Sequence, residues 1–405
     1  MTMTAMTPAQ GLRMPPDGPR LFAAPNPSLA AHFATYGAIP DVTPAQLLEQ
    51  VHRSGLTGRG GAGFPTATKL AAVSGKAIVV ANGAEGEPAS RKDVELLRRA
   101  PHLVLDGVEV AARIIGAEQA YVYLRPEVIP VVQQALAERT GGLRITVEAA
   151  AEGFVSGQET AVVSRLNSGP ALPRFSRYRI FQRGVGGKAT LVQNVETLAH
   201  LALIARYGGL WFTTAGTADS TGTFLTTVGS SVWEVNHGMT LRQLLTSATG
   251  QPAEEWQAVL VGGYHGTWLP LPAALDAPLS REGLELYGTR LGAGVLIPLP
   301  STACGLEFTA SIAGYLAAQS AKQCGPCQFG LPELARNLHA LAEGRGGTEV
   351  IRQTAGLVEG RGACHHPDGT TRMIRSALKV FADDVRLHQH GRCLARIAEP
   401  YGGAR

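Results

Sequence analysis

Apolar runs and amphipathic stretches alternate along the chain from residue 77 to residue 149. Ala77 to Ala81 is a continuous apolar run of strand length, which is typical of a strand buried on both faces of a parallel sheet. Helical spacing follows from Lys92 to Ile115, with a break expected at Pro101. The next segments are a strand, a helix and a strand, at residues 119–124, 127–138 and 143–149. This order predicts a parallel α/β sheet, whose ligands lie in loops at the carboxyl ends of strands.

Capping signals place the starts of several helices. Thr43-Pro44 provides an N-cap and a proline at the first helical position of a short amphipathic helix. Ser90 followed by Asp93 resembles the N-cap and the acidic N3 residue of the helix that begins near Lys92. A further helix is expected from Glu159 to Leu166, and Asn194 opens another.

The pattern changes in the second half of the chain. Short strands and turns from residue 222 to 298 predict a small α+β module, and beyond residue 301 the spacing is helical. Helices are expected there at residues 311–321, 331–343, 349–358 and 371–388. The predicted organisation is an extended leader over residues 1–42, an α/β domain over 43–215, the α+β module over 216–300 and a helical domain over 301–405.

Composition narrows the class of protein. A chain of 405 residues is expected to form two or three domains. The net charge of +4, without a run of basic and aromatic residues, argues against nucleic-acid binding. Neither a membrane-spanning apolar run nor the pattern of a signal peptide is evident, so a cytoplasmic location is expected. Five cysteines in such a chain indicate thiols or metal ligands rather than disulfides.

The stretch from Gly55 to Lys69 is rich in glycine, which helix and strand interiors tolerate poorly. It therefore predicts a loop. Backbone N–H groups without neighbouring Cβ atoms can approach a bulky anion, and Arg59 and Lys69 add positive charge at either end. The functional interpretation is a phosphate cradle, and the alternative is a mobile surface loop.

Other loops carry chemistry of their own. Glu85 and Glu87 follow the strand at residue 81 and could position a polar cofactor, or could form a solvated acidic turn. Asn194 could bind a ligand or simply cap its helix. Cys324-Gly-Pro-Cys327 and the distant Cys364 lie in the helical region, whereas Cys304 in its apolar setting is expected to be a small buried hydrophobe.

Taken together, these loops resemble those of one family. The motifs are Gly58-Arg-Gly-Gly-Ala-Gly-Phe-Pro-Thr66, Asn82 with Glu85-Gly-Glu-Pro88 and Lys92-Asp93, Gly157 with Glu159-Thr-Ala161, Asn194-Val-Glu-Thr197, and the late Cys-x-x-Cys. They occur in the same order in the flavin-carrying 51 kDa or F subunit of respiratory complex I and in the diaphorase subunits of NAD-reducing hydrogenases and formate dehydrogenases. The resemblance covers roughly residues 30 to 390.

The resemblance implies a Rossmann-like FMN-binding domain, a β-grasp module and a C-terminal four-helix iron–sulfur domain. In that family NADH gives a hydride to FMN, and a 4Fe-4S cluster takes the electrons singly. The implied cofactor-binding residues are Gly58, Arg59, Gly60, Gly61, Gly63, Phe64, Lys69, Asn82, Glu85, Gly157, Glu159, Asn194 and Thr197. Among these, Gly58, Gly60, Gly61 and Lys69 would surround the flavin and its phosphate. Asn82, Asn194 and Thr197 would hydrogen-bond the flavin and its ribityl phosphate chain. Glu85, Glu87 and Glu159 would face the nicotinamide nucleotide, and Glu85 and Glu87 are the implied catalytic residues.

Three polar family positions are altered in the nucleotide loops. Ala84 stands where the family has Asp, Gln158 where it has Glu, and Phe154 where it has Tyr. Two aromatic positions for the adenine also differ, since Ala72 and Arg179 replace Phe. The loss of each stack would weaken adenine binding by roughly 1–3 kcal/mol.

The cysteine motif is altered as well. The family pattern Cys-x-x-Cys-x-x-Cys begins here at Ala321, which leaves Cys324, Cys327 and Cys364 as the implied metal ligands. His365, His366, Cys393 or Cys304 could complete the set, or one iron could stay open. An iron–sulfur cluster, a Cys3His zinc site and plain thiols or a disulfide are the three alternatives.

The leading hypothesis is an FMN- and iron–sulfur-dependent electron-transfer subunit. It would pass electrons between NAD(P)H and other redox subunits, with any membrane association made through a partner. One alternative is a carrier fed by a ferredoxin-like partner without NADH oxidation. The other is a non-catalytic docking module with the same fold.

Overall fold

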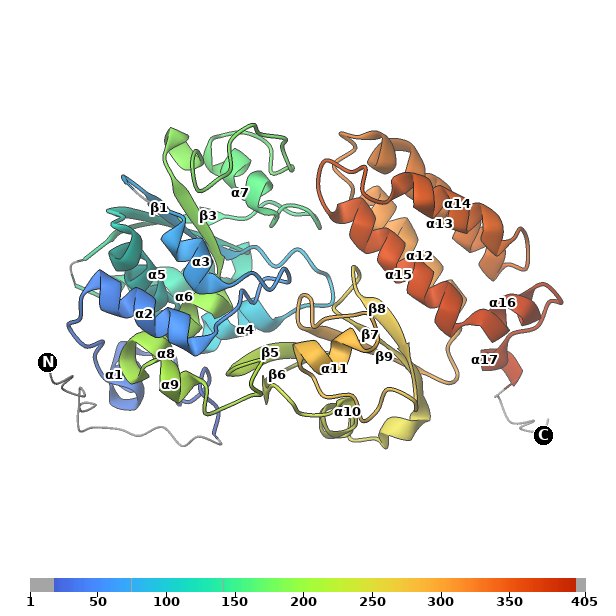
Figure 1. Ribbon diagram of the computed structural model, residues 1–405, viewed down its shortest axis with the longest axis horizontal. Coiled ribbons are helices and arrows are strands. Elements are labelled where there is room, and N and C mark those ends of the chain that lie inside the picture. The colour runs from blue at the N-terminus through green and yellow to red at the C-terminus, as the bar shows by residue number, and fades with distance from the viewer. Residues whose placement is uncertain (1–17, 74, 141, 398–405) are drawn as a thin grey trace, which may run out of the picture. The chain divides into compact units, whose positions relative to one another are not determined.

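The computed structural model describes residues 18–73, 75–140 and 142–397 (Figure 1). These residues form two compact units, each assembled from separate stretches of the chain. Unit 1 comprises the chain up to Gly83, Asp93–Ala149 and Arg179–Phe224, and unit 2 comprises Ala84–Lys92, Ala150–Tyr178 and the chain from Leu225 onwards. The division predicted from the sequence, with boundaries at 43, 216 and 301, stays a prediction.

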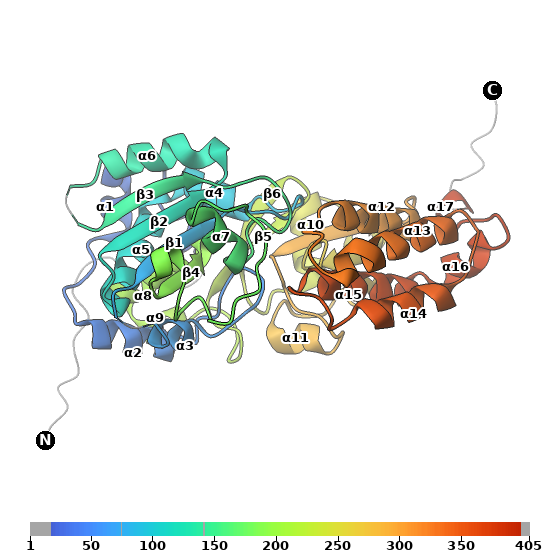
Figure 2. The same ribbon diagram turned by 90° about the horizontal axis from the view of Figure 1, so that it is seen from above.

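Unit 1 contains a four-stranded parallel sheet in the order β3-β2-β1-β4 (Figure 2). Its strands are β1 (Ile78–Gly83), β2 (Gln119–Leu124), β3 (Arg144–Ala149) and β4 (Thr190–Asn194). The first three lie where the apolar runs predict them, and all strand pairs are parallel, so the predicted α/β class is confirmed. Asn82 and Asn194 are paired in register at the carboxyl ends of β1 and β4.

Helices follow the strands of unit 1 as the spacing predicts. They are α1 (Leu29–Tyr36), α2 (Pro44–Ser54), α3 (Thr66–Ala71), α4 (Lys92–Arg99), α5 (Pro101–Ile115), η1 (Pro126–Val128), α6 (Ile129–Ala137), η2 (Val185–Gly187), α8 (Val195–Tyr207) and α9 (Gly209–Phe212). Thr43 forms a full capping box with Gln46, and the expected break at Pro101 separates α4 from α5. A Cβ on Gly107 would lie 1.9 Å from the Leu198 carbonyl oxygen, so α5 and α8 approach closely only because residue 107 is glycine.

The extended leader expected over residues 1–42 is wrong in its second half. Residues 1–17, with Pro8, Pro15 and Pro16, lie outside the described residues, but α1 is a helix capped by Ser28. His32 on this helix lies 2.7 Å from the carboxylate of Asp106 on α5. This buried contact stabilises a helix whose sequence has only weak local signals, because most helical stability in proteins comes from tertiary packing.

Unit 2 contains a five-stranded mixed sheet in the order β6-β5-β9-β7-β8. Its strands are β5 (Thr223–Val228), β6 (Ser231–Asn236), β7 (Trp256–Val261), β8 (Thr267–Pro270) and β9 (Val295–Pro300), with the short helices α10 (Leu241–Thr249), η3 (Ala253–Glu255) and α11 (Arg281–Glu285) between them. Strands β5 and β9 pair in parallel, and β7 pairs antiparallel with both β8 and β9. This arrangement confirms the small α+β module.

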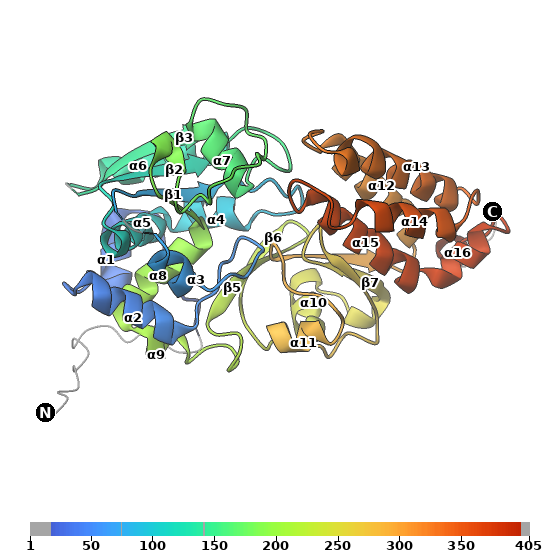
Figure 3. The ribbon, with the colours of Figure 1, turned by 45° about the horizontal axis from the view of Figure 1, so that its top comes forward.

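Beyond residue 301, unit 2 is mostly helical, as predicted (Figure 3). The remaining helices of unit 2 are α7 (Glu159–Leu166), α12 (Gly305–Ala318), the π-helix η4 (Pro326–Gly330), α13 (Leu331–Ala342), α14 (Thr348–Val358), α15 (His366–Val380), α16 (Ala382–His388) and α17 (Leu394–Ile397). The single helix expected over 371–388 is interrupted at Phe381, whose ring occupies the space where Gly305 lacks a Cβ. Among the described residues, none of the helices has the length and apolarity needed to cross a membrane.

Candidate functional site

The glycine-rich stretch forms a closed loop. Thr57 and Pro65 make an antiparallel bridge, and the Gly58 N–H donates to the Phe64 carbonyl at 2.9 Å. Gly61 and Gly63 have positive φ values of 106° and 64°, which are strained for any residue with a Cβ. The loop prediction is thus correct up to Pro65, but α3 begins at Thr66 and places Lys69 in a helix.

Arg59 anchors this loop within unit 1. Its backbone N–H donates to the Thr197 hydroxyl at 2.8 Å, and its guanidinium donates to the carbonyls of Thr221 and Thr223 at 3.0 and 3.2 Å. Burial lowers the pKa of Arg59, although the carboxylate of Glu196 opposes that shift. The guanidinium therefore fixes the loop to neighbouring backbone, a contact that the sequence did not reveal.

The Asn194 side chain, at the carboxyl end of β4, makes hydrogen bonds on both sides of its amide. The Asn194 amide nitrogen donates to the Asp93 carboxylate at 2.7 Å, and its oxygen accepts from the Glu196 N–H at 3.0 Å. The N-cap interpretation of Asn194 is confirmed. A Cβ on Gly60 would lie 3.3 Å from the Asn194 Cβ. Unit 1 thus brings Gly60, Asn194 and the loop anchor Thr197 into one place.

Unit 2 holds the acidic pair. Glu85 and Glu87 are each 9% exposed, so the solvated acidic turn is wrong. Glu85 adopts a positive φ of 44° and accepts a hydrogen bond from the Ser90 hydroxyl at 2.6 Å. Helix α4 begins at Lys92, two residues after Ser90. The N-cap role of Ser90 stays a prediction, because a hydroxyl that donates to Glu85 can still accept from a backbone N–H.

Glu87 has an unusual protonation equilibrium. Its carboxylate accepts from the N–H groups of Tyr264 at 2.8 Å and Ala89 at 3.3 Å. Burial raises the pKa of Glu87 to about 7, and these two hydrogen bonds only partly oppose the shift. The position is tight, because a Cβ on Gly263 would lie 2.6 Å from the Glu87 carboxylate. Such a group can carry or release a proton near neutral pH.

The altered family positions have structural roles in unit 2. The Gln158 side chain caps α7 by accepting from the N–H groups of Thr160 and Ala161 at 2.8 and 3.1 Å. Gly157 precedes this cap, and Glu159 is the first helical residue. The ring of Phe154 packs against His265 and His366, with centroids 4.6 and 5.5 Å apart.

The three implied ligand cysteines are neighbours. Cys327 is buried, and burial, followed by the effects of Cys324 and Cys364, raises its pKa to about 12. Around a single zinc ion, thiolate sulfurs bonded at about 2.3 Å would lie about 3.8 Å apart. Yet among the described residues the only group of three with ligand atoms within 4.8 Å of one another lies elsewhere. The three sulfurs are therefore not all as close together as around a single zinc ion.

The residues that could supply a fourth ligand are exposed, already hydrogen-bonded, or grouped elsewhere. The His365 side chain is fully exposed. Both ring nitrogens of His366 are engaged, at 2.8 Å from the Leu316 carbonyl and 3.1 Å from His265. Cys304 and Cys393 lie together with His388 instead. The trio thus fits a cluster with three protein thiolates, and Cys304 is more than the isolated buried hydrophobe expected.

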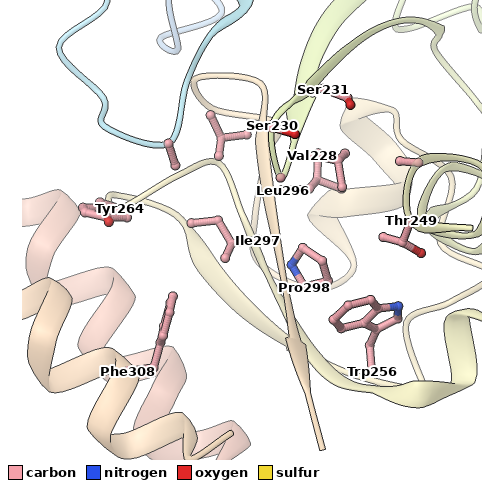
Figure 4. A pocket seen from close by; sticks show the side chains of 14 residues that line it. Val228, Ser230, Ser231, Thr249, Trp256, Tyr264, Leu296, Ile297, Pro298 and Phe308 are labelled. Carbon is pink, nitrogen blue, oxygen red and sulfur yellow. The ribbon is translucent and has the colours of Figure 1, made fainter. Parts of the chain in front are cut away.

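A cavity of about 530 Å³ in the β-strand part of unit 2 was missed by the sequence analysis (Figure 4). Val228, Trp256 and Ile297 come from three strands, while Tyr264 and Phe308 contribute rings. Each is an ordinary apolar residue in its own segment. No local pattern could have identified the cavity, because only the sheet pairing brings these residues together.

Comparisons with known proteins agree with this geometry. A family described as "Nuo51 FMN-binding domain" matches residues 51–203, and the "NADH-ubiquinone oxidoreductase-F iron-sulfur binding region" matches residues 307–388. The F 2 subunit of the NADH-quinone oxidoreductase of Rhizobium meliloti is 31% identical over 88% of this chain and 92% of its own length. The chain belongs to the family of NADH-quinone oxidoreductase F subunits. The F subunit of Mycobacterium tuberculosis is 32% identical over 86% of this chain and 85% of its own length.

Solved structures give the same fold for this family member. An NAD+-reducing nickel–iron hydrogenase in its H2-reduced state superposes with a TM-score of 0.77 at 28% identity, over 85% of this chain. The chain spans 62% of that hydrogenase chain. The predicted family is therefore confirmed, together with its fold and its class as an FMN- and iron–sulfur-dependent electron-transfer subunit. The roles of the individual site residues stay predictions.

Proposed function

We propose that this member of the F subunits oxidises NADH through bound FMN and delivers the electrons singly, through its three-cysteine cluster, to other redox subunits. The observation that carries the proposal is the ordered loop of residues 57–65, which Arg59 and Thr197 fix beside Asn194 in the segment that matches the FMN-binding family. When bound, FMN supplies the conversion between a two-electron donor and one-electron acceptors.

The residues of this chain would have distinct tasks. Gly60, Gly61 and Gly63 leave the loop backbone accessible to a bulky ligand, since they present no side chains. Lys69 supplies positive charge one helical turn after the loop. Glu87 can hold or release a proton near neutral pH. Cys324, Cys327 and Cys364 would hold the cluster, with one iron not bound by a cysteine.

An absorbance spectrum of the anaerobically purified chain, together with its iron content, tests this proposal. Flavin and iron–sulfur bands are expected, and NADH should bleach the flavin band and support ferricyanide reduction. A chain that has iron but no flavin after reconstitution with FMN would contradict the proposal. It would favour a docking module with the same fold.

A second candidate is a carrier fed by a ferredoxin-like partner. The engagement of Gln158 in a helix cap and the packing of Phe154 against two histidines favour it, because neither side chain provides the family's usual polar group. Dithionite would then bleach the flavin while NADH would not. Titration with both reductants on the same sample distinguishes the two functions, and pull-down with redox subunits tests association with a membrane-bound complex.

A further inference from the structure

A second group of sulfur and nitrogen ligands lies in unit 2, apart from the three cysteines of the cluster. The Sγ atoms of Cys304 and Cys393 and a ring nitrogen of His388 all lie within 4.8 Å of one another. The Cys304 Sγ is 3.4 Å from the His388 Nε2. The three residues are 9%, 3% and 6% exposed, respectively. They come from the start of α12, the turn before α17 and the last residue of α16.

The His388 ring is oriented as a ligand. Its Nδ1 is 2.5 Å from the Ala342 carbonyl oxygen, which can only accept, so Nδ1 carries the proton. The lone pair of Nε2 is consequently directed to the side of Cys304. Metal-bound histidines commonly donate their second ring N–H to a backbone carbonyl in this way, because the contact fixes both the tautomer and the ring orientation.

The Cys304 sulfur lies at the N-terminus of the 14-residue helix α12, with the Glu307 N–H 3.5 Å from its Sγ. Two thiolates and one neutral imidazole would balance the charge of a divalent cation, which suits a buried position because an uncompensated charge there would be costly.

We propose that Cys304, His388 and Cys393 bind one Zn²⁺ ion. Thiolate sulfur and imidazole nitrogen are the ligands that zinc prefers, and a water molecule would complete the tetrahedron. Binding releases one proton from each of the two thiols. The ion would connect the start of α12 to the chain after α16, so it would stabilise the helical part of unit 2 without taking part in electron transfer.

Metal analysis of the full-length chain tests this site. After cluster reconstitution and addition of one equivalent of ZnCl2, followed by desalting, we expect about one zinc per chain by mass spectrometry. Cys304→Ser and Cys393→Ser should each lose most of that zinc and keep the iron. Cys327→Ser should have a lower iron content than the wild type and the same zinc content. His339→Gln, at an exposed histidine on α13, is the control and should keep both metals.

X-ray absorption at the zinc edge of the unsubstituted chain tests the site even if the serine variants fold poorly. Two sulfur neighbours at about 2.3 Å and nitrogen or oxygen neighbours at about 2.0–2.1 Å are expected. A first shell without sulfur would overturn the proposal. So would zinc that stays in the Cys304→Ser and Cys393→Ser variants, or a disulfide between these two cysteines in the anaerobically purified chain. None of these outcomes depends on whether the chain oxidises NADH.

Discussion

At the scale of single residues, Glu87 should make the stability of the folded chain depend on pH. Its pKa is raised from 4.5 to about 7, so the folded state retains a proton that the unfolded state has already lost between these pH values. Stability contributed by this group is complete below pH 4.5 and is lost as pH rises through 7. Glu87→Gln cannot ionise. The free energy of unfolding of Glu87→Gln minus that of the wild type should therefore increase by about 3 kcal/mol as the pH is raised from 4 to 8.

Urea unfolding of both proteins across this pH range measures the effect. Glu359→Gln is a suitable control, because Glu359 forms only a half-exposed ion pair with Arg375 and should change the pH dependence little. A constant difference between wild type and Glu87→Gln at all pH values would show that Glu87 titrates as an ordinary surface carboxylate.

Gly60 tests the loop at the same scale. A Cβ there would already lie 3.3 Å from the Asn194 Cβ, so Gly60→Leu must displace the loop from β4. We expect this variant to lose most of its flavin, measured as the ratio of flavin to protein absorbance. Gly356→Leu is the matched control, because Gly356 is exposed on α14 with open space around it. Equal flavin retention in the two variants would contradict the assignment of this loop.

At the scale of elements, α7 depends on an unusual cap. Gln158 accepts hydrogen bonds from two N–H groups in the first turn, which would otherwise lack partners within the helix. Gln158→Ala should therefore lower the free energy of unfolding by about 1 kcal/mol. Gln158→Asn, with a shorter amide, should recover part of that loss. Chemical unfolding monitored by circular dichroism measures both, and an unchanged midpoint for Gln158→Ala would show that the cap contributes little.

The positions of helices and strands were predictable from the sequence where their signals are local. Strand β2 and helix α7 occur at the predicted residues, because apolar runs and helical spacing are local signals. Helix α1 was missed, since it depends on the buried contact between His32 and Asp106. The helix break at Phe381 has the same kind of origin, because that ring packs over Gly305 from a distant helix.

The candidate site was likewise predictable only where its residues form motifs along the chain. Glycine and cysteine motifs predict the loop and the trio of Cys324, Cys327 and Cys364, because these spacings are visible along the chain. The roles of these residues as ligands stay predictions. The engagement of Arg59 with backbone carbonyls and the gathering of Cys304 with His388 were not visible. Both join residues that are more than 80 positions apart, which only the folded chain brings together.

At the scale of the whole molecule, electron transfer requires a cluster that persists, and Ala321 limits its ligation. The family's first cysteine would lie at this position, three residues before Cys324, whereas the histidines near Cys364 are either exposed or already hydrogen-bonded. Ala321→Cys should supply a fourth thiolate, which cubane clusters normally have. We expect about four irons per chain in Ala321→Cys, and a cluster absorbance that decays more slowly in air than in the wild type.

The matched control is Ala321→Ser, which has nearly the same volume but a poorer ligand for iron. Ala321→Ser should have the iron content and cluster lifetime of the wild type. Any increase in these two quantities in Ala321→Cys is then due to the sulfur and not to packing. If NADH reduces the flavin equally in all three proteins while only the lifetime of the cluster differs, flavin reduction does not depend on the fourth cysteine. An equally labile cluster in Ala321→Cys would mean that the fourth iron is not next to residue 321, and that its ligand comes from another part of the molecule.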